Sequence, residues 1–266
     1  MDKEYYKHLL EKNNSQEIDA ENIWDTRAES FNKAQQNDKT GFAKNVTKLL
    51  EEKDILKGKD VLDIGGGSGR YALEFSQFAK SITVTDISKN MLDLALENAK
   101  KQEINNIYVE KLDFENANIK ELGLYKKFDL SFSSMCPALR TVKGLENMIK
   151  TSKKYCVINQ FVKDTDNFRQ NILSKTGLKD DYHPHNDGDV TNALFNLLWL
   201  KGYNPEIRYL KSSINMSLTK DEVNLKYQKL LERVEKHTNF KKEDFLTNET
   251  FEIVTDTILA VILWEV

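Results

Sequence analysis

A glycine-dense turn at residues 65–69 is the part of the sequence best suited to hold a ligand. It follows an apolar run that ends in an acid, and the stretch reads Val61-Leu62-Asp63-Ile64-Gly65-Gly66-Gly67-Ser68-Gly69. Glycines leave no side chain where the backbone must approach a ligand or adopt a positive φ, and the N–H groups that open the next helix favour an anionic group. The pattern therefore predicts a strand, a turn that binds a small charged ligand, and the start of a helix.

The spacing of these glycines excludes two common phosphate-binding motifs. A dinucleotide-binding turn has its third glycine three residues after the second, where this chain has Arg70, and a P-loop needs a Gly-Lys-Ser/Thr sequence that is absent. The pattern from Asp63 to Gly69 is acid-x-Gly-x-Gly-x-Gly. In this form it resembles the first motif of the class I S-adenosylmethionine-dependent methyltransferases, whose acid lies near the ammonium group of the cofactor's methionine moiety.

A second segment resembles the same family. The strand predicted at residues 81–85 ends in Asp86, about 20 residues after the glycines, where a carboxylate can accept hydrogen bonds from a ribose diol. Asp86-Ile87-Ser88-Lys89-Asn90-Met91-Leu92 is similar to the D-x-S-x-x-M-L run of many small-molecule methyltransferases. The resemblance implies that Ile87 and Met91 contact the cofactor, with Met91 packed on adenine. Met91 is also at helical spacing from Leu94, which suits a core position equally well.

Two more segments complete the resemblance between residues 60 and 134. Residues 107–114 end in Asp113 and Phe114, which the family places at the cofactor, with the acid near the adenine amino group. Residues 128–134 resemble the fourth strand, whose end, at Ser133, lies beside the reactive methyl group. Taken singly, Asp86 or Asp113 would be read as a strand-end acid or a helix cap. The four motifs in order favour a cofactor site instead.

The order of the elements predicts an α/β fold. Strands and helices alternate from Lys59 to about Gln160, which is typical of a parallel sheet with helices on both faces. Residues 155–160 are the expected fifth strand, and residues 206–210 and 257–264 are the last two, which the family folds as an antiparallel edge hairpin. We therefore expect a Rossmann-like, doubly wound, seven-stranded and mostly parallel sheet with an antiparallel edge hairpin, an N-terminal helical cap and a helical insert.

These elements predict a single methyltransferase domain over residues 1–266. Residues 1–57 form its helical cap, residues 58–160 its cofactor-binding core, and residues 161–266 its substrate-side helices and closing strands. Helical spacing at positions such as Val223, Leu230 and Val234 places the insert at about residues 218–251. Ligands bind beyond the carboxyl ends of parallel strands, so the insert is expected to wall the substrate pocket or to serve in packing or interaction.

The composition fits a globular enzyme that acts on a small molecule. The chain has 266 residues, 39% of them hydrophobic, with a net charge of −3, which argues against a DNA partner and makes RNA an unfavoured one. The longest apolar stretches are too short to span a bilayer and no leader opens the chain, so we expect a cytoplasmic protein, monomeric or homodimeric. Cys136 and Cys156 have no metal-ligand spacing and indicate reduced thiols, and no metal site is expected.

An N-terminal helix carries two further cofactor candidates. Trp24, Arg27, Ala28 and Phe31 share one helical face, which by itself indicates a plain amphipathic helix. In the resembling family a W-x-x-R-A-x-x-F-type segment often folds over the cofactor. The resemblance would place Trp24 there and bring Arg27 to the cofactor's carboxylate.

Two segments supply candidates for the methyl-transfer step itself. Displacement at a sulfonium is in-line, so the enzyme must align the nucleophile, exclude water and, for some acceptors, remove a proton. Met135 and Cys136 follow the fourth strand and are expected on the substrate side. They lack the amide or acid and the aromatic residue of the Asn/Asp-Pro-Pro-aromatic motif, which disfavours methylation of a nucleic-acid base.

The second segment is a polar loop with two histidines. Tyr182 is expected on the substrate side, and His183 or His185 is the candidate general base for a hydroxyl, amine or thiol acceptor. The alternative interpretation is a surface turn. A metal-assisted mechanism is disfavoured because Asp129 has no second acid and amide at the usual places, and His-x-His alone is a weak metal site.

The sequence thus predicts S-adenosylmethionine-dependent methyl transfer to the oxygen, nitrogen or sulfur of a small molecule. An RNA methyltransferase is one alternative, although the sequence lacks an evident basic, aromatic-lined face. A non-catalytic regulatory or scaffold protein that keeps the cofactor site is another, because Asp63, Asp86 and Asp113 would bind the cofactor without doing chemistry. A nicotinamide-dependent dehydrogenase is opposed by Arg70.

Overall fold

The computed structural model describes residues 2–12, 19–181 and 183–266, and its contacts divide the chain into two compact units. Unit 1 comprises Met1–Gln160, Gly188–Leu210 and Leu259–Val266. Unit 2 comprises Phe161–Asp187 and Lys211–Ile258. The second unit therefore contains the helical insert expected at about residues 218–251 together with a segment that precedes it.

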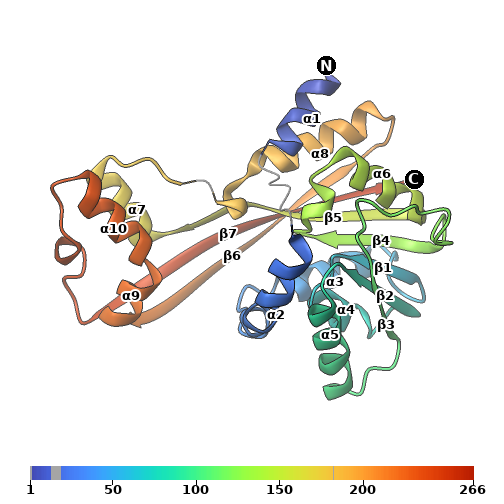
Figure 1. Ribbon diagram of the computed structural model, residues 1–266, viewed down its shortest axis with the longest axis horizontal. Coiled ribbons are helices and arrows are strands. Elements are labelled where there is room, and N and C mark those ends of the chain that lie inside the picture. The colour runs from blue at the N-terminus through green and yellow to red at the C-terminus, as the bar shows by residue number, and fades with distance from the viewer. Residues whose placement is uncertain (1, 13–18, 182) are drawn as a thin grey trace. The chain divides into compact units, whose positions relative to one another are not determined.

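Helices and strands alternate through most of unit 1 (Figure 1). The α-helices are α1 (Lys3–Glu11), α2 (Ala20–Gln36), α3 (Phe42–Glu52), α4 (Arg70–Phe75), α5 (Lys89–Lys101), α6 (Val142–Thr151), α7 (Asn167–Thr176), α8 (Gly188–Leu200), α9 (Lys220–Lys226) and α10 (Gln228–His237). The strands are β1 (Asp60–Ile64), β2 (Ser81–Asp86), β3 (Ile107–Lys111), β4 (Phe128–Ser134), β5 (Ser152–Asp166), β6 (Glu206–Thr219) and β7 (Thr250–Glu265). Three short 3₁₀ turns are η1 (Pro137–Leu139), η2 (Pro184–Asn186) and η3 (Lys242–Asp244).

The described strands form one sheet of seven in the order β3-β2-β1-β4-β5-β7-β6. The first five strands of that order pair in parallel, and β7 and β6 complete the sheet as antiparallel edge pairs. The predicted fold class is confirmed. Strand order reverses between β1 and β4, so the carboxyl ends of these two strands mark the switch point at which such sheets bind ligands.

The last strands are longer than the sequence indicates. β5 runs to Asp166, β6 to Thr219, and β7 begins at Thr250, whereas their apolar parts alone suggested residues 155–160, 206–210 and 257–264. The added residues of β6 alternate between half-buried and exposed, the period of two that a strand imposes. Polar side chains on these strands hide the pattern from an analysis based on apolar runs.

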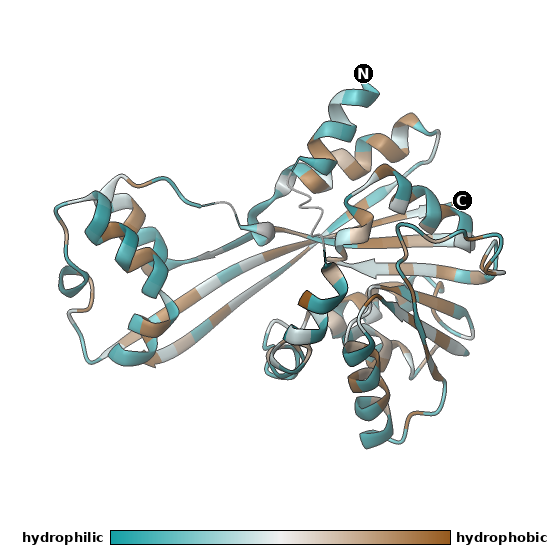
Figure 2. Ribbon diagram, in the orientation of Figure 1, coloured by the Kyte–Doolittle hydropathy of each residue, from teal (hydrophilic) through white to brown (hydrophobic). Residues whose placement is uncertain are grey.

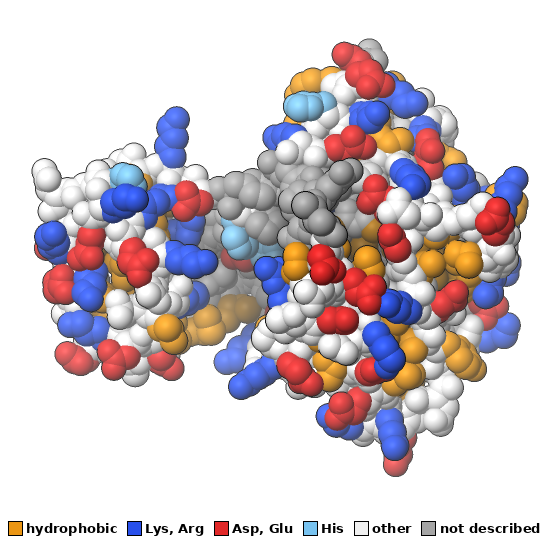
Figure 3. All heavy atoms as spheres, viewed as in Figure 1, with side chains coloured by type: hydrophobic (Ala, Val, Ile, Leu, Met, Phe, Trp, Pro, Cys, Tyr) orange, Lys and Arg blue, Asp and Glu red, His pale blue; other side chains and the backbone are white. Residues whose placement is uncertain are grey.

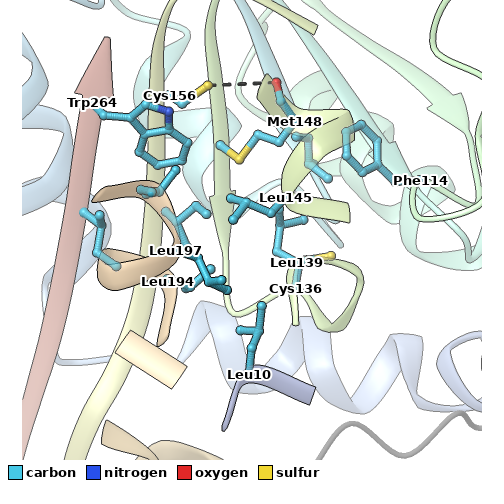
Figure 4. Close-up of a cluster of buried hydrophobic side chains, with 14 of the residues drawn as sticks. Leu10, Phe114, Cys136, Leu139, Leu145, Met148, Cys156, Leu194, Leu197 and Trp264 are labelled. Atoms are coloured by element: carbon cyan, nitrogen blue, oxygen red, sulfur yellow. Dashed lines mark hydrogen bonds between the residues drawn. The ribbon is translucent and has the colours of Figure 1, made fainter. Parts of the chain in front are cut away.

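The largest hydrophobic core lies in unit 1, on one side of β1, β4 and β5. Leu62, Ile64 and Ile158 point into it from the strands, and the largely hydrophobic α8 adds Leu194 and other buried residues (Figure 2). Figure 4 shows part of this cluster, with the Cys156 thiol 3.9 Å from the carbonyl oxygen of Met148. The core fixes the strand ends from which the candidate site residues project.

Helix caps place the elements that frame the site. The Ser88 hydroxyl accepts a hydrogen bond of 3.1 Å from the backbone N–H of Met91 and so begins α5 directly after β2. Thr141 starts α6 in the same way through Gly144, at 3.0 Å. Unit 2 has its own core, in which Val223 of α9 and the apolar face of α10 pack with Phe168 of α7.

The surface carries mixed charge. On the face shown in Figure 3, Lys and Arg side chains are interspersed with Asp and Glu side chains over the described residues of each unit. In the described part of the chain, no helix combines the length and the apolar character that crossing a membrane requires.

Candidate functional site

The glycine turn between β1 and α4 has the backbone that the sequence predicts. Gly65, Gly67 and Gly69 have φ values of 63°, 56° and 87°, in the left-handed region that L side chains rarely adopt. Gly66 is excluded from substitution for another reason, since a Cβ there would lie 2.6 Å from an oxygen of Asp63. A Cβ on Gly65 would overlap the sulfur of Cys136. The turn is therefore shaped by close approach as well as by φ.

Asp63 of β1 is an acid without a partner. Its residue is 1% exposed, and its Oδ2 atom has no hydrogen bond in the described structure. Burial, with a smaller contribution from the neighbouring Asp86 carboxylate, raises the pKa of Asp63 to about 7. A buried carboxylate in this state is suited to a cationic donor, because the donor would supply both the hydrogen bond and the opposite charge.

Asp86 at the end of β2 ties the turn to the next helix. One carboxylate oxygen accepts the Gly67 N–H at 3.0 Å and the other accepts the Ser88 N–H at 2.9 Å. Burial raises the pKa of Asp86, and these backbone donors oppose the increase. Asp63 and Asp86 thus come together beside the turn, as the four-motif resemblance implies.

Helix α2 is docked on this region. The Asp25 carboxylate accepts hydrogen bonds of 2.5 Å from the Ser88 hydroxyl and 3.1 Å from the Asn90 backbone N–H at the start of α5. Further along α2, the Ser68 hydroxyl in the turn donates to Gln35 at 2.9 Å. The helix therefore covers both the glycine turn and the first turn of α5.

Helix α2 brings to the turn Phe31, the last residue of the W-x-x-R-A-x-x-F-type segment. Phe31 of α2 packs with Met91, which is 1% exposed, and its ring lies 3.4 Å from the point where a Cβ on Gly67 would be. Trp24 meets Phe31 edge-on with ring centroids 5.7 Å apart, and the exposed Arg27 lies over the Trp24 ring at 5.9 Å. The contact of Arg27 with a cofactor carboxylate stays a prediction.

Arg70, the residue that replaces the third glycine of a dinucleotide turn, has a structural partner. Its guanidinium forms an ion pair with Asp38, whose carboxylate also accepts a hydrogen bond of 2.8 Å from the Thr40 hydroxyl. The pair connects the start of α4 to the segment before α3. Arg70 therefore has a structural role, because its ion pair with Asp38 holds these two segments together.

The remaining adenine-side candidates follow β2 and β3. Ile87 is half-buried in the β2–α5 turn. Asp113 is exposed and accepts a hydrogen bond of 2.8 Å from the side-chain amide of Asn116, while Phe114 is 4% exposed and belongs to the core of unit 1. Their contacts with a cofactor stay predictions.

The end of β4 carries three candidates with different surroundings. The buried Ser133 hydroxyl donates to the carbonyl oxygen of Ile64 at 2.9 Å and so links β4 to β1. Met135 has a φ of 56°, and its N–H donates to the Asn159 carbonyl oxygen at 3.1 Å. Burial raises the pKa of the Cys136 thiol to about 12, which keeps it neutral and suits a pocket wall better than a nucleophile.

The end of β5 holds two residues that the sequence prediction omitted. Asn159 and Gln160 are 0% and 1% exposed, and neither side-chain amide has a hydrogen bond in the described structure. The signal available in the sequence was a pair of amides that ends an apolar strand, at the end of a parallel strand where ligands bind.

The histidine loop lies in unit 2. His185 Nδ1 is 3.2 Å from the Asp164 carboxylate, and the ring packs on Phe161 with centroids 4.3 Å apart. Burial lowers the pKa of His183, with a smaller effect from the neighbouring His185. Tyr182 lies outside the described residues. Among residues that the structure does describe, no group of three or more His, Cys, Asp or Glu side chains could hold a metal ion.

Comparison with known proteins identifies the family of the chain. A family model described as a methyltransferase domain matches residues 55–194, just over half of the chain. A solved S-adenosylmethionine-dependent methyltransferase from Aquifex aeolicus aligns with a TM-score of 0.50 over 86% of this chain and 97% of its own, at 14% identity, which is a likeness of fold.

Curated relatives match a short segment. The ubiquinone biosynthesis O-methyltransferase of Coxiella burnetii is 34% identical over 58 residues, which are 22% of this chain and 25% of that protein. The release factor glutamine methyltransferase of Streptococcus pneumoniae is 40% identical over 70 residues, 26% of this chain and 25% of that protein. The chain thus spans about a quarter of the length of the curated relatives it matches, and their names point to different acceptors.

Proposed function

This chain belongs to the class I S-adenosylmethionine-dependent methyltransferases, and from that premise we propose that it methylates an oxygen, nitrogen or sulfur atom of a small molecule. The observation that carries the proposal is the orphaned carboxylate of Asp63 beside a turn with three left-handed glycines. A dinucleotide would present phosphates to this turn, which a buried acid disfavours. An amino-acid ammonium would satisfy it.

The residues around the turn fit the parts of S-adenosylmethionine. Asp63 would accept from the ammonium, and Asp86 from the ribose hydroxyls, with oxygen lone pairs that its two backbone donors leave free. Ile87 and Met91 would contact adenine, with Asp113 at its amino group. When bound, the cofactor supplies an electrophilic methyl group on a sulfonium.

The chain's own contribution to the chemistry is to align, shield and accept a proton. Helix α2, held by Asp25, covers the turn and would exclude water from it. For an acceptor that must lose a proton, we propose that His183 or His185 is the base. The lowered pKa of His183 favours the neutral imidazole that a base requires.

Several properties support a small acceptor over RNA. The net charge is −3, and both signs of charge are interspersed on the face seen in Figure 3, whereas RNA binding favours a basic track.

We further propose that the protein works as a monomer or homodimer in the cytoplasm, where free thiols such as those of Cys136 and Cys156 stay reduced.

Calorimetric titration with S-adenosylmethionine, S-adenosylhomocysteine and NAD tests the cofactor. Micromolar binding of the first two without NAD is the expected result, and NAD binding alone would refute the assignment. Transfer of labelled methyl groups to a panel of phenols, amines and thiols, run beside total RNA, then tests the acceptor. Label in RNA alone would favour the RNA methyltransferase, and cofactor binding without transfer to any acceptor would favour a regulatory protein.

A further inference from the structure

The side chain of Asn159 is buried in unit 1 without any hydrogen bond. The residue is 0% exposed, and both Oδ1 and Nδ2 lack a partner in the described structure. A buried amide in this state destabilises the fold, and most buried polar groups in proteins are paired. The protein therefore carries a cost at the end of β5 that an apolar residue would avoid, which points to a ligand that pairs the amide.

Strand register places Asn159 on the same face of the sheet as Asp63. Asp63 of β1 is opposite Phe132 of β4, and two residues later Ser134 is opposite Asn159 of β5. Side chains two residues apart on a strand share a face, and register partners in neighbouring strands do too. The two residues with orphaned polar atoms, Asp63 and Asn159, therefore project from the same face at the carboxyl ends of the parallel strands.

Tyr71 connects this face to the glycine turn. It lies in the first turn of α4, and its ring packs on Phe132 with centroids 4.8 Å apart. Burial raises the pKa of Tyr71, whereas Arg70 and interactions of the Tyr71 hydroxyl with the side chains of Ser134 and Asn159 oppose the increase. The Asn159 amide therefore faces the Tyr71 hydroxyl, but the two groups do not form a hydrogen bond of ordinary geometry. The amide thus lies near Tyr71, two residues after the glycine turn, and a ligand can offer it a better-placed partner.

The two orphaned groups complement an amino-acid zwitterion. Asp63 offers an acceptor to an ammonium group, and the Nδ2 atom of Asn159 offers a donor to a carboxylate. On the proposed function, the ligand that brings both charges to this place is the methionine moiety of S-adenosylmethionine. We infer that Asn159 is a cofactor-binding residue whose side-chain amide donates to the carboxylate of that moiety.

The amino-acid end of the ligand would lie beside the turn that α2 covers. The Phe31 ring lies 3.4 Å from the point where a Cβ on Gly67 would be, so α2 forms part of the wall beside the turn. Asp63 would bind the ammonium group and Asn159 the carboxylate of the ligand's amino-acid end. A ligand that lacks this end should therefore bind more weakly.

Two ligands and two neighbouring residues test the inference. S-adenosylhomocysteine carries the amino-acid end, and 5′-methylthioadenosine keeps the nucleoside and the sulfur without it. Asn159→Leu removes the amide at similar size, and Gln160→Leu is the matched control, because Gln160 is equally buried and unpaired but projects with Ile158 to the opposite face. Titration calorimetry of both ligands on the wild type and both variants gives the affinities.

We expect Asn159→Leu to weaken S-adenosylhomocysteine about tenfold or more, the scale of a hydrogen bond to a charged group, and to leave 5′-methylthioadenosine unchanged. Gln160→Leu should leave both affinities unchanged. Both variants should melt at or above the wild-type temperature, because each removes an unpaired buried amide. If Asn159→Leu does not fold, Asn159→Asp replaces it and should weaken S-adenosylhomocysteine selectively through repulsion of the carboxylate.

Three outcomes overturn the inference. The first is unchanged affinity of Asn159→Leu for S-adenosylhomocysteine, and the second is an equal loss for both ligands. The third is that Arg27→Ala no longer binds S-adenosylhomocysteine more tightly than 5′-methylthioadenosine, while Asn159→Leu still does. This result would assign the carboxylate to Arg27 and not to Asn159. If the wild type binds S-adenosylhomocysteine in any of these cases, the proposed cofactor survives, whereas a wild type that binds neither ligand refutes both proposals.

Discussion

The affinity for S-adenosylhomocysteine should depend on pH through Asp63. The free protein holds this carboxyl at a pKa of about 7, because burial and then the Asp86 carboxylate disfavour its charge. An ammonium group bound beside it favours the charged form, so binding must release a proton wherever Asp63 is protonated in the free protein. Affinity should therefore fall as the pH falls below about 7.

The size of the effect follows from the ionised fraction. A group with a pKa of about 7 is about one-tenth ionised at about pH 6 and about nine-tenths ionised at about pH 8. The dissociation constant should then be about tenfold larger at the lower pH. Asp63→Asn should bind more weakly at the higher pH and lose the dependence, whereas Asp129→Asn, an acid at the other end of the sheet that accepts the Asp60 N–H, should keep it.

Calorimetry in two buffers of different ionisation enthalpy measures both the affinity and the protons released. Near pH 6 the wild type should release close to one proton, and Asp63→Asn should release none. A dissociation constant that is flat from pH 6 to pH 8, with heats independent of the buffer, would refute the assignment of Asp63 to the ammonium group.

Three other changes have definite expected results. Asp86→Ala should weaken S-adenosylhomocysteine by about 1–3 kcal/mol in a titration, since it removes a charged acceptor for the ribose hydroxyls and for two backbone N–H groups. Gly67→Val should abolish binding while the protein stays folded by circular dichroism, because the φ of 56° and the ring of Phe31 leave no room for a branched side chain; unchanged affinity would move the site elsewhere. Gly144→Ala should lower the free energy of unfolding in urea by about 1–3 kcal/mol, because its Cβ would overlap the carbonyl oxygen of Ala138, and a smaller loss than that of an exposed control would contradict the packing.

The free energy of unfolding of the ligand-free protein should also depend on pH through Asp63, but it should fall as the pH rises, whereas the affinity rises. The folded pKa of Asp63, about 7, exceeds the ordinary value of 3.8, so the contribution of its protonated form is present below about pH 4 and is lost as the pH rises through about 7. The loss is on the order of 4 kcal/mol at most. Urea unfolding of the free protein at about pH 5 and pH 8 should show the part of this loss that falls between pH 5 and 7, about 3 kcal/mol at most, and Asp63→Asn should remove it.

The sequence predicts the parts of the site that local backbone chemistry specifies. The glycines from Gly65 to Gly69 and the acids Asp63 and Asp86 could be predicted from the sequence, because turn geometry and strand ends impose residue types at fixed spacing. The fold class followed from the alternation of strands and helices and is confirmed. The polar extensions of β6 and β7 were missed because only apolar runs were counted as strand.

Residues that reach the site through packing were harder to predict. Phe31 belongs to the segment that the resemblance places over the cofactor, but its contact with the glycine turn depends on how α2 docks along α5, which helical spacing does not specify. Asn159 was omitted because the property that singles it out, a buried amide without a hydrogen bond, depends on β4, α4 and β5 together. Composition and spacing do not determine which polar atoms lose their partners on folding.

The attachment of α2 has a kinetic consequence. The helix is held near its start, where Asp25 accepts from Ser88 and Asn90, and near its end, where Gln35 accepts from Ser68. A ligand that enters beneath it must wait for one of these ends to detach. Association should therefore be a two-step process whose observed rate levels off at high ligand concentration, at the rate of undocking, well below the rate at which ligand and protein meet by diffusion.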